Sequence, residues 1–258
     1  MKQTADKLKL LFNKEGMFHP QFEGFRIQDK IKQSDAVLLG FPLMMSMKPE
    51  IRRNDLFIYE NVTDKFGPDT GTWSMHTVGW LELNDEQKAA DMFKMLLRNI
   101  NGPFKVFSEK PASSPEGPRC VNFITGAGGL LHAVFFGYGG IRIRESTLDI
   151  NPHMLPGVRE WAIRGIKYKG FTFDLRVNHS HVQFILTNLS GNENSIYVTS
   201  SQHGTTMLDL NNAQEFVRRN FTLNVKEANS SPWKNNAKTL QWSRRFVLIS
   251  FLSLLLYV

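Results

Sequence analysis

The sequence predicts an α+β chain whose first part is helical and whose second part is a small antiparallel β-sandwich. Two patterns carry this prediction. Apolar residues recur at helical spacing before Gly137, and beyond it they alternate with polar residues at the period of a strand. The change falls at "GYGG", whose glycines are typical of a turn. We therefore expect a helical part over residues 1–138, a β-sandwich over 139–227 and a tail over 228–258.

Four segments justify the helical part. "KPEIRRNDLFIYENVTDKFG" places apolar side chains on one broad face and closes with Gly67. "GTWSMHTVGWLELN" is a second, largely buried segment, and "DEQKAADMFKMLLRNI" begins with an Asp-Glu turn that suits a helix dipole. "CVNFITGAGGLLHAVFFG" is again helical in spacing, and its glycines Gly126, Gly128 and Gly129 are expected where a helix passes close to another group.

The strand pattern is clearest in two neighbouring segments joined by the turn "NHSH". The first has apolar residues at every second position, and the second continues the same alternation beyond the turn. The apolar positions are Phe171, Phe173, Leu175 and Val177, then Val182, Phe184 and Leu186. Turn signals recur about every ten residues through this part, which is typical of a small sandwich.

Composition excludes several classes of function. The chain has 258 residues, 41% of them hydrophobic and 21% charged, as is usual for a globular protein. Its net charge of +7 is scattered, with no basic stripe interleaved with aromatics, so we expect no nucleic-acid partner. Cys120 is the single cysteine and is expected to be a small buried residue, and the seven histidines show no metal-ligand spacing. "GAGGLL" breaks the dinucleotide-binding pattern at Leu131, so no dinucleotide site is expected.

The two ends of the chain differ in character. The first residues do not resemble a signal peptide, and Leu8 to Phe12 look like the end of an amphipathic helix. The last segment, Phe246 to Val258, is apolar, and a helix of that length covers roughly 20 Å, less than a bilayer. It fits either the hydrophobic end of a glycolipid-anchor signal, which would be the single membrane attachment, or a terminal core element.

Glycosylation sequons are frequent in this sequence, and they bear on its location in the cell. Such crowding favours a secretory or cell-surface route, and a cytoplasmic location is the alternative. The sequons begin at Asn61, Asn178, Asn188, Asn220 and Asn229.

Three polar residues are candidates for a carbohydrate site. Glu109 lies after "GPFKVFS", in a loop rich in Pro and Ser, and it is either a solvated charge or a catalytic carboxylate. Lys32 and Gln33 precede the apolar run "SDAVLLGFPL". They either end a surface segment or face a cleft, where an ammonium and an amide bind sugar hydroxyls.

Six segments occur in an order that resembles glycoside hydrolase family 65. They are "FHPQFEGF", "IKQSDAVLLGFPL", "IRRNDLFIYENVT", "TWSMHTVGWLEL", "PFKVFSE" and "VNFITGAGGLLHAVFFGYGGIRI". The resemblance runs from about Phe12 to Leu186. It implies that the chain holds the C-terminal part of a catalytic (α/α)6 toroid followed by a β-sandwich, and that the N-terminal half of the parent enzyme is missing.

The resemblance also implies a reaction and roles for residues. It implies an inverting hydrolase, in which an acid protonates the leaving oxygen and a base activates water on the opposite face. Glu109 corresponds to the general base, while Lys32 and Gln33 correspond to glucose-binding residues. The general acid belongs to a "DEYH"-like motif that does not occur in this sequence, so we expect the chain alone to be inactive.

The substrate implied by the resemblance is the glucosylated hydroxylysine glycan of collagen or a related α-glucoside. Two alternatives remain open at this point. One is a non-catalytic carbohydrate-binding or scaffold fragment. The other is a disaccharide phosphorylase of the same family, although the presence of Glu109 favours hydrolysis.

Overall fold

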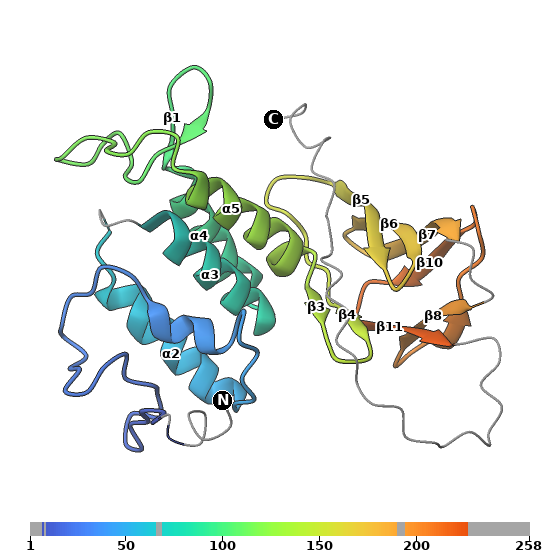
Figure 1. Ribbon diagram of the computed structural model, residues 1–258, viewed down its shortest axis with the longest axis horizontal. Coiled ribbons are helices and arrows are strands. Elements are labelled where there is room, and N and C mark those ends of the chain that lie inside the picture. Colours follow the sequence, from blue (N-terminus) through green and yellow to red (C-terminus); the bar gives the residue numbers. More distant parts are fainter. Residues whose placement is uncertain (1–6, 8, 66–68, 190–193, 227–258) are drawn as a thin grey trace. The chain divides into compact units, whose positions relative to one another are not determined.

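The computed structural model describes residue 7 and residues 9–65, 69–189 and 194–226. The chain divides after Gly140 into two compact units. The first unit is built from helices, and the second from antiparallel strands (Figure 1). The expected order of helices followed by an antiparallel β region is therefore confirmed, whereas the toroid stays a prediction. The tail expected over 228–258 lies outside the described residues.

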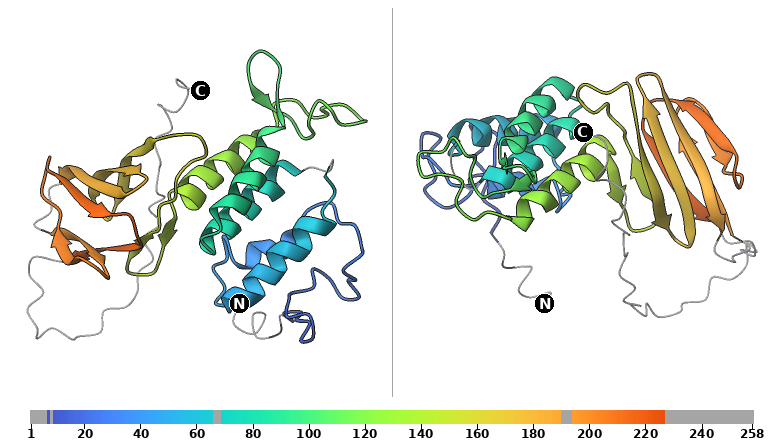
Figure 2. Two further views of the ribbon diagram at one scale, coloured as in Figure 1. Left: turned by 180° about the vertical axis from the view of Figure 1, so that it is seen from behind. Right: turned by 90° about the horizontal axis from the view of Figure 1, so that it is seen from above.

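The first unit is organised around one central helix, α3. This helix contacts α2, α4, α5 and the π-helical segment η2, and Figure 2 shows the helices side by side. Its side chains Trp73, Val78 and Leu81 are almost completely buried. The elements of this unit are η1 (Asp35–Leu39), α2 (Pro49–Val62), α3 (Asp69–Glu82), α4 (Glu86–Leu97), β1 (Ile100–Asn101), β2 (Val106–Phe107), α5 (Ile124–His132) and η2 (Ala133–Tyr138).

Local sequence explains where these helices begin. Pro49 stands at the first position of α2, where its missing N–H and fixed φ cost nothing. The side chain of Asp85 caps α4 by accepting a hydrogen bond from the Lys88 N–H at 3.1 Å. The helix end expected at the start of the chain is wrong for residues 9–12, which form no helix and expose Leu10 and Phe12. Both side chains stay largely exposed, so the apolar spacing of this segment is not used to bury a helix face.

The second unit consists of two antiparallel sheets. One sheet has the order β10-β7-β6-β5, and the other has the order β3-β4-β11-β8-β9. The strands are β3 (Ile141–Ile143), β4 (Leu148–Ile150), β5 (Glu160–Tyr168), β6 (Phe171–Asn178), β7 (His181–Leu189), β8 (Ser195–Ser200), β9 (Gly204–Met207), β10 (Ala213–Val217) and β11 (Phe221–Lys226).

Aromatic side chains join the two sheets. Phe184 of β7 contacts Phe221 of β11 across the unit, with ring centroids 5.3 Å apart, and Phe216 of β10 contacts both. All three rings are buried. The two sheets therefore share one apolar core, as the sheets of a sandwich do.

The alternation predicted for β6 and β7 is confirmed. Every apolar position named for these strands is buried, and the two strands pair from Phe171↔Leu189 to Val177↔Val182. Asn178 shapes the turn between them, because its Oδ1 accepts hydrogen bonds from the Ser180 and His181 N–H groups.

Strand β5 forms one edge of its sheet and contains an irregularity. Its register with β6 shifts between Ile163 and Ile166. Within this β-bulge, Gly165 has a φ of +69° and its N–H donates to the Asp174 carboxylate at 2.8 Å. Two cationic side chains near the bulge, Arg164 and Lys167, are exposed.

Candidate active site

Lys32 and Gln33 lie side by side in an exposed segment that leads into η1. The segment is tied to the end of α2 by an isolated parallel bridge between Ile31 and Thr63. Its backbone bonds run from the Ile31 N–H to the Val62 carbonyl at 3.1 Å and from the Asp64 N–H to the Ile31 carbonyl at 2.8 Å. The backbone is thus fixed while both side chains face outward.

Three buried polar side chains next to this pair are joined by hydrogen bonds. The hydroxyl oxygen of Ser34, the residue after Gln33, is 2.5 Å from the Thr63 hydroxyl and 3.2 Å from the His76 Nε2 atom. All three side chains are buried, and burial lowers the pKa of His76 to about 3. The imidazole is therefore neutral near pH 7, and it supports the loop by hydrogen bonding rather than by charge.

Gln33 and Lys32 have different surroundings. The Gln33 side-chain amide donates to the Asp35 carboxylate at 2.9 Å, and the Gln33 backbone carbonyl accepts from the Gln21 side-chain amide at 3.1 Å. Lys32 lines an open cavity of about 550 Å³ together with Lys30, Ile31, Asp64 and Lys65. The Lys32 ammonium in the lining and the exposed amide of the next residue, Gln33, are both hydrogen-bond donors of the kind that bind sugar hydroxyls.

Lys65, one of the residues that line this cavity, has a shifted pKa. Its Nζ atom lies 4.6 Å from the centre of the Trp73 ring and donates to the Glu60 carbonyl. Burial lowers the pKa of Lys65, and Lys30 and Arg98 act in the same direction. Cationic side chains outnumber the single carboxylate of the lining, so the cavity favours electron-rich ligand groups.

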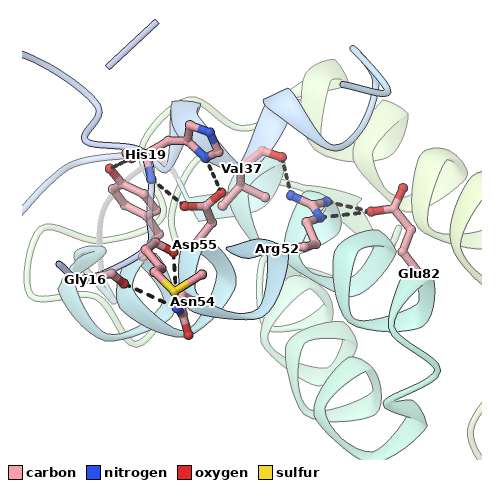
Figure 3. Close-up of polar contacts among 9 residues, drawn as sticks. Gly16, His19, Val37, Arg52, Asn54, Asp55 and Glu82 are labelled. Atoms are coloured by element: carbon pink, nitrogen blue, oxygen red, sulfur yellow. Dashed lines mark hydrogen bonds and ion pairs between the residues drawn. The ribbon is translucent and has the colours of Figure 1, made fainter. Parts of the chain in front are cut away.

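Helix α2 anchors the segment through a buried arginine (Figure 3). Arg52 donates to the Val37 carbonyl of η1 at 2.7 Å and to the Glu82 carboxylate of α3 at 2.7 Å. It occupies a narrow channel, because a Cβ added at Gly40 would lie 2.2 Å from its Cζ and one at Gly79 would lie 2.8 Å from its Nη2. Arg52 therefore fixes η1, the element that follows Lys32 and Gln33, against α3.

A second buried pair fixes the preceding loop to the same helix. The His19 backbone N–H and its Nδ1 reach the two oxygens of the Asp55 carboxylate at 2.7 and 2.8 Å (Figure 3). The Tyr59 hydroxyl donates to the His19 carbonyl at 2.6 Å. Burial raises the pKa of Asp55, and the hydrogen bonds from His19 oppose that shift.

Glu109 lies in a separate loop of the same unit, immediately after β2. The loop is closed at its base by two backbone bonds, from Glu109 N–H to the Cys120 carbonyl at 3.2 Å and from Lys110 N–H to the Pro118 carbonyl at 3.1 Å. Glu109 itself is half-buried. Its backbone is thus held in place, and the two ends of the loop beyond it are hydrogen-bonded to each other.

The expectation that Cys120 is buried is wrong, because the thiol is exposed. The sequence pattern suggested that an apolar helix begins at this residue, but α5 begins at Ile124. Cys120 instead ends the Glu109 loop, where its carbonyl faces inward to Glu109 and its side chain faces solvent.

At Gly128 the described residues provide no close approach, because a Cβ added there would meet open space, so the expected approach of a ligand stays a prediction. Crowded glycines occur elsewhere, and they include Gly40 and Gly79 beside Arg52. The structure therefore assigns close approach to glycines that the sequence pattern did not single out.

The three predicted site residues come from two places in the helical unit. Lys32 and Gln33 share one segment, and Glu109 belongs to the loop after β2. The sequence pattern missed the buried residues that support the first segment, Arg52 and His76. A single weak signal was available, the polar pair "RR" inside the otherwise amphipathic α2.

Two features are absent from the residues that the structure describes. No three His, Cys, Asp or Glu side chains in this part of the chain are grouped as a metal site requires. No helix among these residues has the length and hydrophobicity needed to span a membrane.

Comparison with known proteins gives sequence relatives with consistent names. The chain is 39% identical over 230 residues to protein-glucosylgalactosylhydroxylysine glucosidase from Danio rerio, covering 89% of this chain and 34% of that protein. It is 33% identical over 131 residues to a kojibiose hydrolase from Mucilaginibacter mallensis, covering 50% of this chain and 18% of that protein. No protein-family model matches the sequence.

A solved structure shares the fold. It is a putative kojibiose phosphorylase from the human microbiome, with a TM-score of 0.60 at 15% identity, covering 84% of this chain and 33% of that chain. The chain thus spans about a third of the length of this protein and of the Danio rerio relative.

Proposed function

We propose that this chain, which belongs to the glycoside hydrolase family 65 group, is the part of an inverting α-glucosidase that supplies the general base and part of the glucose subsite. The helical unit is then the C-terminal part of an (α/α)6 toroid. The observation that carries the proposal is the half-buried Glu109, held at the closed base of its loop within the segment that resembles the family's base region.

In this proposal Glu109 takes a proton from water as the water attacks the anomeric carbon. The glycosidic bond breaks on the opposite face, so an α-glucoside yields β-glucose. Lys32, which lines the cavity, and Gln33, the next residue in the chain, donate hydrogen bonds to glucose hydroxyls. Water is the nucleophile, and the scheme requires neither a metal nor an organic cofactor.

The proposed substrate is the α-glucose of the glucosyl-galactosyl-hydroxylysine unit or of a related α-glucoside. Support comes from relatives named for that glycan and for kojibiose. The general acid is outside these 258 residues, because no "DEYH"-like motif occurs among them. The chain alone is therefore expected to release no glucose from kojibiose or from the collagen glycan, since the leaving oxygen is not protonated.

A substrate that needs no acid tests the base in the chain itself. α-Glucosyl fluoride fits, because fluoride leaves without a proton while water adds to the anomeric carbon. We expect slow fluoride release with β-glucose as the first product by NMR. Glu109→Gln should lower the rate by about 10²-fold, the usual scale of a general base.

Glu116→Gln is the matched control, because Glu116 is an exposed carboxylate of the same loop, paired with Lys110 and Arg119. This variant should keep the wild-type rate. Equal rates for wild type and Glu109→Gln would contradict the proposed base and favour a non-catalytic carbohydrate-binding fragment. Phosphate-dependent formation of glucose 1-phosphate would favour a phosphorylase.

The glucose subsite has its own measurement. Lys32→Ala and Gln33→Ala should raise the KM for the fluoride by about tenfold each, as expected when a hydrogen bond of roughly 1.4 kcal/mol to the sugar is lost. An unchanged KM in both variants would remove these residues from the subsite.

A further inference from the structure

A buried asparagine lies beneath the Glu109 loop. Asn99 follows the last turn of α4 and is completely buried. Its side-chain amide donates two hydrogen bonds to consecutive backbone carbonyls, that of Glu109 at 2.9 Å and that of Ser108 at 3.3 Å. The amide therefore binds the peptide group of the residue proposed as the base.

Ser108 completes this attachment from the other side. Its N–H donates to the Asn99 carbonyl at 2.9 Å, and its Oγ lies 3.2 Å from the same carbonyl. The hydroxyl also reaches the Lys110 carbonyl at 2.5 Å. The backbone on both sides of Glu109 is thus bonded to one buried point.

The short hairpin of β1 and β2 supplies a second amide. Asn101 donates to the Asn99 carbonyl at 2.9 Å and to the Ser108 hydroxyl, and its Oδ1 accepts from the Ala112 N–H at 3.2 Å. The pairing of Ile100 with Phe107 holds the two strands that flank these polar groups next to each other. The hairpin is short, so its polar side chains rather than its ladder fix the loop.

The chemistry of an amide is required at position 99. Two buried carbonyl oxygens need donors, and the Asn NH₂ group supplies both hydrogens. A carboxylate of the same size would turn an acceptor toward two acceptors, and a methyl group would leave both carbonyls without this donor. A general base also has to be held within about 0.5 Å of its productive position.

We propose that Asn99 is a positioning residue for Glu109, acting through the peptide carbonyl of that residue. This inference rests on the proposed function, in which Glu109 is the general base. Asn99 itself touches no substrate atom in this scheme. Its effect is to fix the point from which the Glu109 side chain extends toward the attacking water.

The same unit contains a matched control. Asn54 clamps two consecutive carbonyls in the same manner, those of Gly16 at 3.3 Å and Met17 at 3.1 Å, on a different loop (Figure 3). Replacing Asn54 therefore removes the same number of carbonyl hydrogen bonds, from a half-buried instead of a fully buried position, without touching the Glu109 loop. An effect of losing any asparagine clamp should then appear in both positions, whereas an effect on the Glu109 signal should appear at Asn99 alone.

The test compares Asn99→Asp, Asn99→Ala, Asn54→Asp and Asn54→Ala in the full chain, with α-glucosyl fluoride as the probe. For the Asn99 variants we expect kcat to fall by roughly 10- to 10²-fold with KM unchanged, as for a misplaced catalytic group. Amide exchange of Glu109 and Lys110 should accelerate, and the assigned ¹³C carboxyl signal of Glu109 should move. The Asn54 variants should keep kcat and the Glu109 signal.

Each outcome is decisive. Unchanged kcat in folded Asn99 variants, with loss of rate in Glu109→Gln, overturns the inference and leaves the proposed function intact. Equal losses in the Asn54 and Asn99 variants also overturn it, because the effect is then structural. If Glu109→Gln keeps the wild-type rate, the proposed function fails and the inference fails with it. If Asn99→Ala does not fold, two other variants test the inference. Asn99→Asp preserves the side-chain volume, and Asn101→Ala removes hydrogen bonds to Asn99 and Ser108 from the hairpin.

Discussion

The two units of this chain bury different kinds of side chain. In the helical unit, charged and polar groups such as Arg52, Asp55 and His76 lie in the interior, each with partners from other segments. In the β unit the interior is aromatic and aliphatic, and its buried polar residues among those described are His153 and Ser200.

This difference shows how each unit is specified. A β unit built by period-two alternation needs apolar residues of about the right size at alternate positions. The helical unit needs particular donors to meet particular acceptors, because a buried polar group without its partner is costly. The candidate site lies in the unit with the stricter requirement.

Arg52→Met should give the largest change. It removes the buried guanidinium and its hydrogen bonds to the Glu82 carboxylate and the Val37 carbonyl. We expect the helical unit to lose about 3–5 kcal/mol of unfolding free energy, measured by denaturant titration with exchange of α2 and α3 amides as the probe. The neighbour Arg53 is the control: its pair with Asp85 is 3.5 Å long and half-exposed, so Arg53→Gln should cost less than about 1 kcal/mol. Equal losses in the two variants would remove the contrast between buried and surface charges.

The second-largest effect is expected from acid, which should destabilise the helical unit through its buried His76. The folded protein keeps His76 neutral, with a pKa of about 3 against 6.5 for the free side chain. Unfolding therefore takes up a proton below about pH 6.5. The stability from this group is present above pH 6.5 and is lost as the pH falls toward 3, at about 1.4 kcal/mol per pH unit. His76→Phe should flatten that slope between pH 6 and 4, measured by unfolding at a series of pH values. An identical slope in wild type and variant would show that His76 does not titrate in this way.

The smallest change is expected in the apolar interior. Ile196→Val removes one methylene from a fully buried position of β8 and should cost about 0.5–1.5 kcal/mol, measured by thermal unfolding. Because no polar partner is lost, the native spectrum should be preserved. A loss as large as that of Arg52→Met would mean that the β interior is as strictly specified as the helical one.

Much of this fold was predictable from local pattern. The alternation of β6 and β7 and the spacing of α3 and α4 depend on neighbours in sequence, so periodicity alone located them. The polar interior was not predictable, because Arg52 meets Glu82 and His19 meets Asp55 across some 30 to 36 positions. No local pattern encodes such partners.

The residues of the candidate site were likewise predictable only in part. The family resemblance pointed to Glu109, Lys32 and Gln33, and their roles stay predictions. Asn99 was missed because a single asparagine after a helix is usually a cap. Its contacts to the carbonyls of Ser108 and Glu109 become visible only when the hairpin of β1 and β2 is folded.

The bulge in β5 has a consequence for how this protein behaves in a crowded solution. An edge strand offers unpaired backbone groups to the edge of any other molecule, and a flat edge invites the growth of intermolecular sheets. Here the register shift between Ile163 and Ile166 bends that edge. The exposed cations Arg164 and Lys167 add mutual repulsion between copies. The same irregularity that interrupts the ladder thus makes the β5 edge a poor template for a strand of another molecule.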